Sequence, residues 1–201
     1  PRESIDAPQE IIRQLLALGL HWDLEVLCQS SRLSSYDAAL KSIQPFTFPC
    51  ACSRKAVPDV YPGTCRLRKH LTQDRPTAVR LQVPRRSVSI NDRCLGLQTW
   101  DLEKEVGDFV IKRKDGLHAY QLAVVVDDIH YSVSHIVRGN DLLDSTPRQL
   151  ALYEHFKVPP PEYLHIPVLV DESGNKLSKQ AHAKPVDTRD ALTTNRSALS
   201  D

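Results

Sequence analysis

The sequence predicts an α/β fold in which a parallel sheet with flanking helices is interrupted by an inserted α+β subdomain. From residue 109 onward, short apolar runs that suit strands alternate with helical patterns, which is typical of parallel sheets. Between residues 45 and 108, apolar residues instead recur at a spacing of two or irregularly, and prolines lie at positions 49, 58, 62, 76 and 84. We therefore expect residues 1–44 and 109–180 to build the main domain, residues 45–108 to be the insertion, and residues 181–201 to be a polar C-terminal tail.

Two amphipathic helices are predicted before the insertion. Asp6, Ala7 and Pro8 form a helix start with proline in the first turn, and Gly19 follows as a stop signal. Apolar residues between these signals lie on one helical face, at positions 11, 12, 15, 16 and 18. Helical spacing returns between Ser34 and Ile43.

The strands expected later in the chain give one arginine a special position. Val79–Val83 alternates as a strand of the insertion, Phe109–Ile111 predicts a strand that returns to the main sheet, and residues 133–137 predict another. A third helix is expected from Thr146, with Leu150, Tyr153 and Phe156 on its buried side. Because ligands collect at the carboxyl ends of parallel strands, Arg138 is expected at a binding edge. Its guanidinium can hold a carboxylate through paired hydrogen bonds.

Cysteines in the insertion predict a metal site. Cys50, Cys52 and Cys65 place three thiols within sixteen residues, and Tyr61 adds a phenol. A structural zinc ion takes four such donors in a tetrahedron, so a fourth ligand is needed, for which both Tyr61 and His70 are candidates. The alternative is that these cysteines pack as small apolar side chains. A Cys-x-Cys pair beside a Pro-Gly turn is a poor core pattern, and it favours zinc.

Composition limits the classes of function. The 201 residues are 41% hydrophobic and 25% charged, which is ordinary for a globular protein. The formal net charge is only +1, so a nucleic-acid partner would have to be held by local clusters such as residues 66–70, 85–86 and 112–114. No secretory signal or long apolar span is recognised. We expect a monomer in the reducing cytoplasm, without a membrane partner.

A basic loop near the end of the chain predicts phosphate binding. Residues 166–170 form an apolar run and residues 171–174 a turn, after which Lys176, Ser178 and Lys179 follow within the pentapeptide Lys-Leu-Ser-Lys-Gln. Two ammonium groups with a hydroxyl between them can contact a polyphosphate whose charge shifts during transfer.

Three segments carry a family resemblance. Residues 115–128, 135–143 and 145–149, in this order, closely resemble the second half of the catalytic domain of class I glutamyl-tRNA synthetases, and the Lys176 pentapeptide resembles that class's second signature loop, of the Lys-Met-Ser-Lys-Ser type. The resemblance implies a partial Rossmann-like catalytic domain. It also implies that Tyr120 and Arg138 bind glutamate, that Lys176, Ser178 and Lys179 bind ATP with its Mg²⁺, and that Lys176 and Lys179 are catalytic.

The spacing of the metal ligands is similar to one branch of this family. Tyr61 lies shortly before Cys65, as in glutamyl-queuosine tRNA(Asp) synthetases, truncated paralogues in which a tyrosine completes the zinc site; Leu67 stands where full-length glutamyl enzymes carry a histidine. This resemblance favours Tyr61 over His70 and implies a ligase that transfers glutamate to queuosine in the anticodon of tRNA(Asp). The alternatives are a fragment of a conventional enzyme that charges tRNA(Glu), and a non-catalytic zinc-binding remnant.

The chain begins at Pro1 and contains no methionine. The family's first signature, of the His-Ile-Gly-His type, is not found in it. Because that segment normally contacts ATP and the amino acid, we expect this chain by itself to show little or no activation of glutamate.

Overall fold

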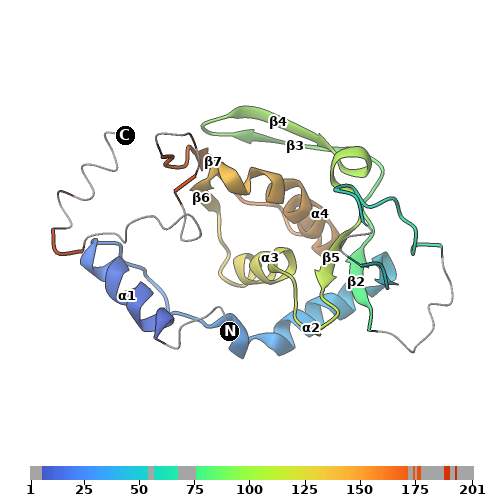
Figure 1. Cartoon of the computed structure of the whole chain (residues 1–201), viewed down its shortest axis with the longest axis horizontal. Helices are drawn as coiled ribbons and strands as arrows, with labels where there is room; N and C mark the ends of the chain where they lie inside the picture. The colour runs from blue at the N-terminus through green and yellow to red at the C-terminus, as the bar shows by residue number, and fades with distance from the viewer. Residues whose placement is uncertain are drawn as a thin grey trace. The chain divides into compact units, whose positions relative to one another are not determined.

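The computed structural model describes residues 6–53, 57–67, 76–171, 174, 176–177, 188–190 and 193. The chain separates into two compact units (Figure 1). One comprises Cys28–Pro167, and the other combines Pro1–Leu27 with Val168–Asp201.

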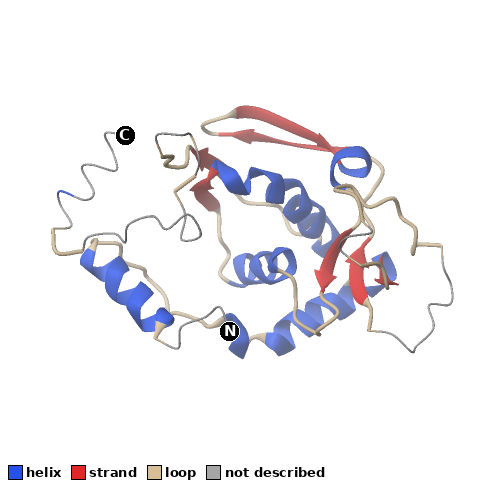
Figure 2. Ribbon diagram, viewed as in Figure 1, coloured by secondary structure: helices blue, strands red, loops and turns tan. Residues whose placement is uncertain are grey.

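The larger unit contains three small sheets (Figure 2). An antiparallel sheet has the order β1-β2-β5, from Thr47–Cys50, Ala78–Leu81 and Phe109–Lys112. A hairpin joins β3 and β4, Ser87–Asp92 and Gly96–Asp101. The third sheet pairs β6 with β7 in parallel, His135–Gly139 with Glu162–Ile166. Because α4 follows β6 and precedes β7, this pair is a crossover unit of the kind that the sequence predicts.

Helices cover these sheets. The α-helices of the larger unit are α2, α3 and α4, at Leu33–Ser42, Tyr120–His130 and Thr146–Phe156. Short 3-10 segments lie at Gln29–Ser31, Gln44–Phe46 and Asn140–Ser145, and a π-helix, η4, at Leu102–Val106. Pro147 lies in the first turn of α4, where its missing N–H has no helical partner to lose. The helix ends at Phe156, and the next residue, Lys157, takes the left-handed conformation common after a last turn.

Two separate hydrophobic clusters hold the larger unit together. The main one joins α3, α4, β2, β5 and η4 and includes the fully buried Leu81, Leu102, Ile111, Leu122 and Leu152. Each such side chain contributes roughly 1.5–3 kcal/mol by leaving water. The second cluster contains Cys50, Tyr61 and Cys65, with Phe48, Cys52 and Val57 packed against it. The cysteine loops therefore have a core of their own, distinct from the helical one.

The other unit holds α1, Ala7–Ala17, and a turn near the end of the chain. None of the residues of α1 is buried. At the two ends of the expected turn, the Gly174 N–H donates to Asp171 O at 2.9 Å, and Val170 bridges to Lys176; residues 172 and 173 lie outside the described residues. Among the described residues, no helix is long and apolar enough to cross a membrane.

The three predicted helices are confirmed, each within a residue or two of its expected start. The strands at 79–83, 109–111 and 133–137 are also present, with shifted ends, as β2, β5 and β6. One expectation was wrong: β5 does not return to the parallel sheet but pairs with β2 in antiparallel fashion. Leu81 and Ile111 on these strands are fully buried in the main cluster, so antiparallel pairing still covers their apolar faces.

Candidate functional site

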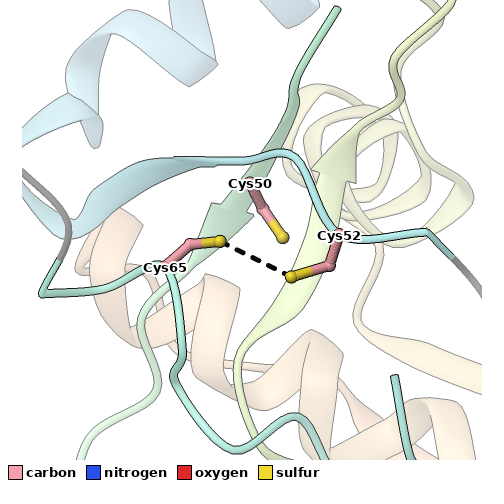
Figure 3. Close-up of side chains that lie close together, drawn as sticks. All are labelled: Cys50, Cys52 and Cys65. Atoms are coloured by element: carbon pink, nitrogen blue, oxygen red, sulfur yellow. Dashed lines mark hydrogen bonds between the residues drawn. The ribbon is translucent and has the colours of Figure 1, made fainter. Parts of the chain in front are cut away.

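The three predicted thiols meet in one place. Cys50 ends β1, Cys52 lies in the loop after it, and Cys65 lies in a turn beyond Tyr61. Their sulfur atoms all lie within 4.8 Å of one another and point toward a common centre (Figure 3). Cys50 and Cys65 are each 1% exposed, so the centre is shielded from water on that side.

The Tyr61 phenol, predicted as the fourth ligand, lies beside the three thiols. Its oxygen lies 3.6 Å from the Cys50 sulfur and 3.8 Å from the Cys52 sulfur, and the sulfurs of Cys52 and Cys65 are 3.5 Å apart. A tetrahedral zinc site with Zn–S bonds of about 2.3 Å has ligand-to-ligand edges of roughly 3.8 Å. These three separations therefore match the edges of a tetrahedral metal site, and all three sulfurs lie within 4.8 Å of one another. His70 lies outside the described residues.

Arg80 and Asp108 surround this cluster with charge. The Arg80 guanidinium lies 3.9 Å from the centre of the Tyr61 ring and donates to the Asp108 carbonyl at 2.6 Å. Arg66, in the turn after Cys65, forms a paired ion contact with the buried Asp108 carboxylate. Asp108 also accepts the Val83 N–H at 3.0 Å. The loop that presents Tyr61 and Cys65 is thus tied to β2 and to the start of β5.

These charges act on the thiols. Burial raises the pKa of Cys50, but its hydrogen bonds with Tyr61 and Arg80 outweigh burial and lower the pKa to about 7. Burial, together with hydrogen bonds to Cys65 and Cys50, raises the pKa of the Tyr61 phenol. A thiolate is the form that binds a metal, so Arg80 makes the cluster better suited to a cation.

The predicted carboxylate-binding arginine lies on β6, one residue before its end. Arg138 Nε donates to His165 Nε2 at 3.1 Å, and its Nη2 donates to Thr146 Oγ1 at 2.9 Å. The guanidinium carbon lies 5.4 Å from the centre of the Tyr163 ring, which stacks on the His165 ring. Arg138 is therefore held from one side by β7 and from another by the start of α4.

Tyr120, the other predicted substrate residue, begins α3 and is 48% exposed. Burial raises the pKa of the Tyr163 phenol; the nearby Arg138 cation opposes this rise, and Asp128 and Tyr120 add to it. Within the described part of the chain, the Tyr163 hydroxyl has no hydrogen-bond partner. Both predicted substrate residues therefore act electrostatically on the Tyr163 phenol.

The basic loop is only partly described. Lys176 bridges to Val170, and the Leu177 N–H donates to Leu169 O at 2.9 Å. Ser178 and Lys179 lie outside the described residues.

Several basic side chains that were candidates for phosphate contact have acidic partners instead. Arg85 pairs with Glu103, Arg86 with Glu154, Lys112 with Asp37, and Arg113 with Asp115. Such exposed pairs contribute little stability, but they reduce the positive charge that these clusters offer to a polyanion.

Sequence reasoning missed four residues that support the two sites: Arg80, Asp92, Asp108 and His165. Asp92 and His165 are 73 positions apart, and their contact depends on how the β3–β4 hairpin reaches β7. No local sequence pattern predicts a contact between residues so far apart in the chain. A buried histidine on a short apolar strand, His165, was the available signal.

Comparison with known proteins assigns the chain to one family. The family model for the catalytic domain of class I tRNA synthetases (E and Q) matches residues 63–198. The chain is 45% identical over 213 residues to a glutamyl-Q tRNA(Asp) synthetase of Cupriavidus metallidurans, covering 98% of this chain and 69% of that protein. It is 44% identical to the protein of that name from Ectopseudomonas mendocina, covering 92% of this chain and 64% of the relative. The chain thus spans about two thirds of the length of these relatives.

Solved structures agree on the fold. A glutamate tRNA ligase from Elizabethkingia meningosepticum, in complex with its amino acid, superposes with a TM-score of 0.75 at 21% identity. The glutamate-tRNA synthetase from Elizabethkingia anophelis gives 0.76, also at 21%. Each match covers 89% of this chain and 43% of the solved one.

Proposed function

The chain belongs to the catalytic-domain family of class I glutamyl- and glutaminyl-tRNA synthetases, and we propose that it serves the ATP-dependent transfer of glutamate to queuosine in the anticodon of tRNA(Asp). The observation that carries the choice of acceptor is the Tyr61 oxygen among three thiols, because the sequence resemblance links a tyrosine ligand to the queuosine branch. The names of the relatives support the same branch.

The first chemical step joins glutamate to AMP. A carboxylate oxygen of glutamate attacks the α-phosphorus of ATP, the bond from that phosphorus to the bridging oxygen breaks, and pyrophosphate leaves with the electron pair. Arg138 holds a carboxylate of glutamate, and Tyr120 contacts the same substrate. Lys176 and Lys179, with Ser178, stabilise the charge that develops on pyrophosphate, so the chain contributes chiefly positioning and electrostatics.

The second step transfers the glutamyl group. A hydroxyl oxygen of queuosine attacks the carbonyl carbon of glutamyl-adenylate, AMP leaves, and the hydroxyl proton is released. No covalent enzyme intermediate is needed. Mg²⁺ enters with ATP as part of the substrate.

Zinc has a structural role in this proposal. Cys50, Cys52, Cys65 and Tyr61 would hold it, and it would supply folding free energy to loops that bury little apolar surface. Four protein donors, three of them buried (Cys50, Tyr61 and Cys65), favour a structural ion over a catalytic one, which needs an open position.

The test is glutamate-dependent exchange of pyrophosphate into ATP, with and without tRNA, beside the full-length Cupriavidus metallidurans relative as a positive control. Labelled glutamate is then offered to tRNA(Asp) with queuosine, tRNA(Asp) without it, and tRNA(Glu). Exchange without tRNA, and label only on the queuosine-containing tRNA(Asp), is the expected pattern for an active protein that contains this chain. Label on tRNA(Glu) would instead identify a conventional glutamyl-tRNA synthetase.

A matched pair of variants sharpens the assay. Arg138→Lys keeps the charge but loses the fork that pairs with a carboxylate, and it should weaken glutamate use at least about tenfold. Arg86→Lys changes an exposed arginine that pairs with Glu154 and should leave glutamate use unchanged. Equal activity in both variants would mean that Arg138 does not bind glutamate.

A further inference from the structure

We propose that Asp92 and His165 are positioning residues for Arg138, and that they fix one edge of its guanidinium so that the other edge faces a substrate carboxylate. This inference rests on the proposed function only for the identity of the ligand, glutamate. The arrangement of the three side chains is independent of it.

The protonation of His165 follows from its partners. An arginine guanidinium can only donate, so His165 Nε2, at 3.1 Å from Arg138 Nε, must be an acceptor without a proton. The neutral ring then carries its proton on Nδ1, which lies 2.7 Å from the Asp92 carboxylate. His165 is 0% exposed and Asp92 is 2% exposed, so water does not compete for these bonds. Asp92 therefore selects the tautomer that can receive Arg138.

The bonds to Arg138 leave a particular edge of the guanidinium open. Nε donates to His165 Nε2 and Nη2 to Thr146 Oγ1, and those two acceptors are themselves only 3.3 Å apart. Both bonds thus use the edge on the Nε side. Within the described residues, Nη1 meets no hydrogen-bond acceptor, so Nη1 and the second N–H of Nη2 form a free parallel pair. Two parallel N–H donors match the two oxygens of a carboxylate.

Asp92 is itself rigidly held. It ends β3 at the tip of the hairpin, where its carboxylate accepts the N–H groups of Cys94 and Leu95 at 3.0 and 2.9 Å. It also accepts the backbone N–H of His165 at 3.2 Å. The hairpin lies along α4 and reaches β7, so the region predicted as an insertion contributes a side chain that supports the arginine (Figure 1). A carboxylate fixed by these backbone N–H groups can hold the imidazole without moving.

Nuclear magnetic resonance of the ¹⁵N-labelled imidazole tests the arrangement in this chain without any ligand. In the wild-type chain, Nδ1 of His165 should be protonated and Nε2 should not. In Asp92→Asn, the amide can present its NH₂ to Nδ1, and the proton should move to Nε2. A wild-type ring protonated on Nε2 would overturn the proposal. A ring unchanged in Asp92→Asn would do the same.

Binding of glutamate tests the consequence. His165→Phe removes the acceptor for Arg138, whereas His165→Gln can restore one near the position of Nε2. We expect glutamate affinity to fall about tenfold or more in His165→Phe and to recover largely in His165→Gln, while ATP affinity stays within about twofold in both. His135→Gln, at an exposed histidine of β6, is the matched control and should match the wild type.

The outcomes separate the two proposals. If both His165 variants lose glutamate and ATP binding together, His165 is only structural and the positioning role is wrong. The wild-type chain and the full-length relative could bind no glutamate while nuclear magnetic resonance shows the expected His165 tautomer. In that case the positioning role is supported and glutamate is not the substrate. If glutamate binds and the tautomer is the opposite one, the substrate stands and the positioning role fails.

Discussion

The position of one oxygen atom supports Tyr61 as the fourth ligand of the proposed metal site. The Tyr61 oxygen accepts the Cys65 N–H at 2.8 Å and lies beside two further sulfurs, so it is held in place by the loop that it would share with the metal. The ring around that oxygen is fixed separately, by Phe48 on one side and by the Arg80 guanidinium. Oxygen and ring can therefore be tested independently.

Tyr61→Phe should keep the packing of the ring and lose the donor. We expect zinc affinity to fall by at least about tenfold. Loss of a residue that only hydrogen-bonds to a metal ligand lowers metal affinity by roughly 10–100-fold, and loss of a ligand itself should cost no less. Competition with a coloured chelator measures it. His70→Ala is the companion variant, since His70 is the other candidate for the fourth ligand. A large loss in His70→Ala with none in Tyr61→Phe would reverse the assignment.

The stability of the folded chain should depend on pH through the Asp92 carboxylate. Burial opposes its charge, but hydrogen bonds from His165 and from the N–H groups of Leu95 and Cys94 lower its pKa from 3.8 to about 2. Because the folded pKa is the lower one, the stabilisation is fully present above about pH 4 and is lost as the pH falls toward about 2. The shift corresponds to about 2 kcal/mol in the free energy of unfolding.

Urea unfolding at a series of acidic pH values measures this dependence. Asp92→Asn should be less stable at neutral pH, and its stability should fall less steeply between about pH 4 and about pH 2. Glu162→Gln, an exposed carboxylate on β7 that pairs with Arg93, is the matched control and should keep the wild-type slope. Parallel slopes in wild type and Asp92→Asn would show that the carboxylate is not stabilised by folding.

Some secondary-structure elements could be predicted from the sequence and others could not. The helices at α1, α2 and α4 were predictable because proline starts and apolar spacing are local signals. Helix α3 is different: Val124, Val125 and Val126 are β-branched and favour strands when considered alone, and burial of Leu122 and Val125 in the main cluster overrides that preference. The pairing of β5 with β2 also escaped prediction, because an apolar strand does not encode its partner.

The candidate sites divide in the same way. Cys50, Cys52, Tyr61 and Cys65 could be predicted as metal ligands because they lie close together in the sequence, and the structure brings the three thiols together. Arg138 was found by its place after a strand, and by resemblance. Asp92 and His165 were not found, since a contact between a hairpin tip and a distant strand exists only in the folded chain.

A substitution at Gly107 tests how the loop that carries Tyr61 is packed. It follows η4 at a φ of +64°, and a Cβ there would lie 2.8 Å from the Tyr61 N and 2.9 Å from Val60 Cγ1. Gly107→Ala should therefore destabilise the fold by at least about 1–3 kcal/mol and weaken zinc binding, because the displaced backbone carries Tyr61. Thermal unfolding and chelator competition measure the two effects.

Gly116→Ala is the matched control for backbone strain. Gly116 has a φ of +86°, but nothing lies within 4 Å of the position that an added Cβ would take. The variant should lose some stability and keep its zinc affinity. If the two variants lose zinc equally, the close approach of Gly107 to Tyr61 has no part in holding the site.

At the scale of the whole molecule, the sites are distributed over separately stabilised parts. The cysteine cluster has its own hydrophobic core, whereas Arg138 depends on β6, β7 and α4. The lysine loop belongs to the other compact unit. Because the two hydrophobic clusters of the larger unit have no buried side chain in common among the described residues, loss of the metal should be felt locally.

Removal of zinc therefore has a specific expected pattern in hydrogen exchange. Amides in residues 47–53 and 57–67 should exchange faster after chelation, because their small core of Cys50, Tyr61 and Cys65 loses the ion that joins its loops. Amides of α3, α4 and β5 should keep their protection, since the main cluster buries their apolar side chains without any contribution from the metal.

Cysteine variants supply the controls for that experiment, and glutamate binding extends it. Cys52→Ser should reproduce the effect of chelation, whereas Cys28→Ser, at an exposed cysteine, should not. Because the bonds that orient Arg138 come from His165 and Thr146, glutamate affinity should change less than about twofold when zinc is removed. A loss of protection in α3 and α4 on chelation, together with a loss of glutamate binding, would instead mean that the metal stabilises the entire larger unit and that its two cores fold as one.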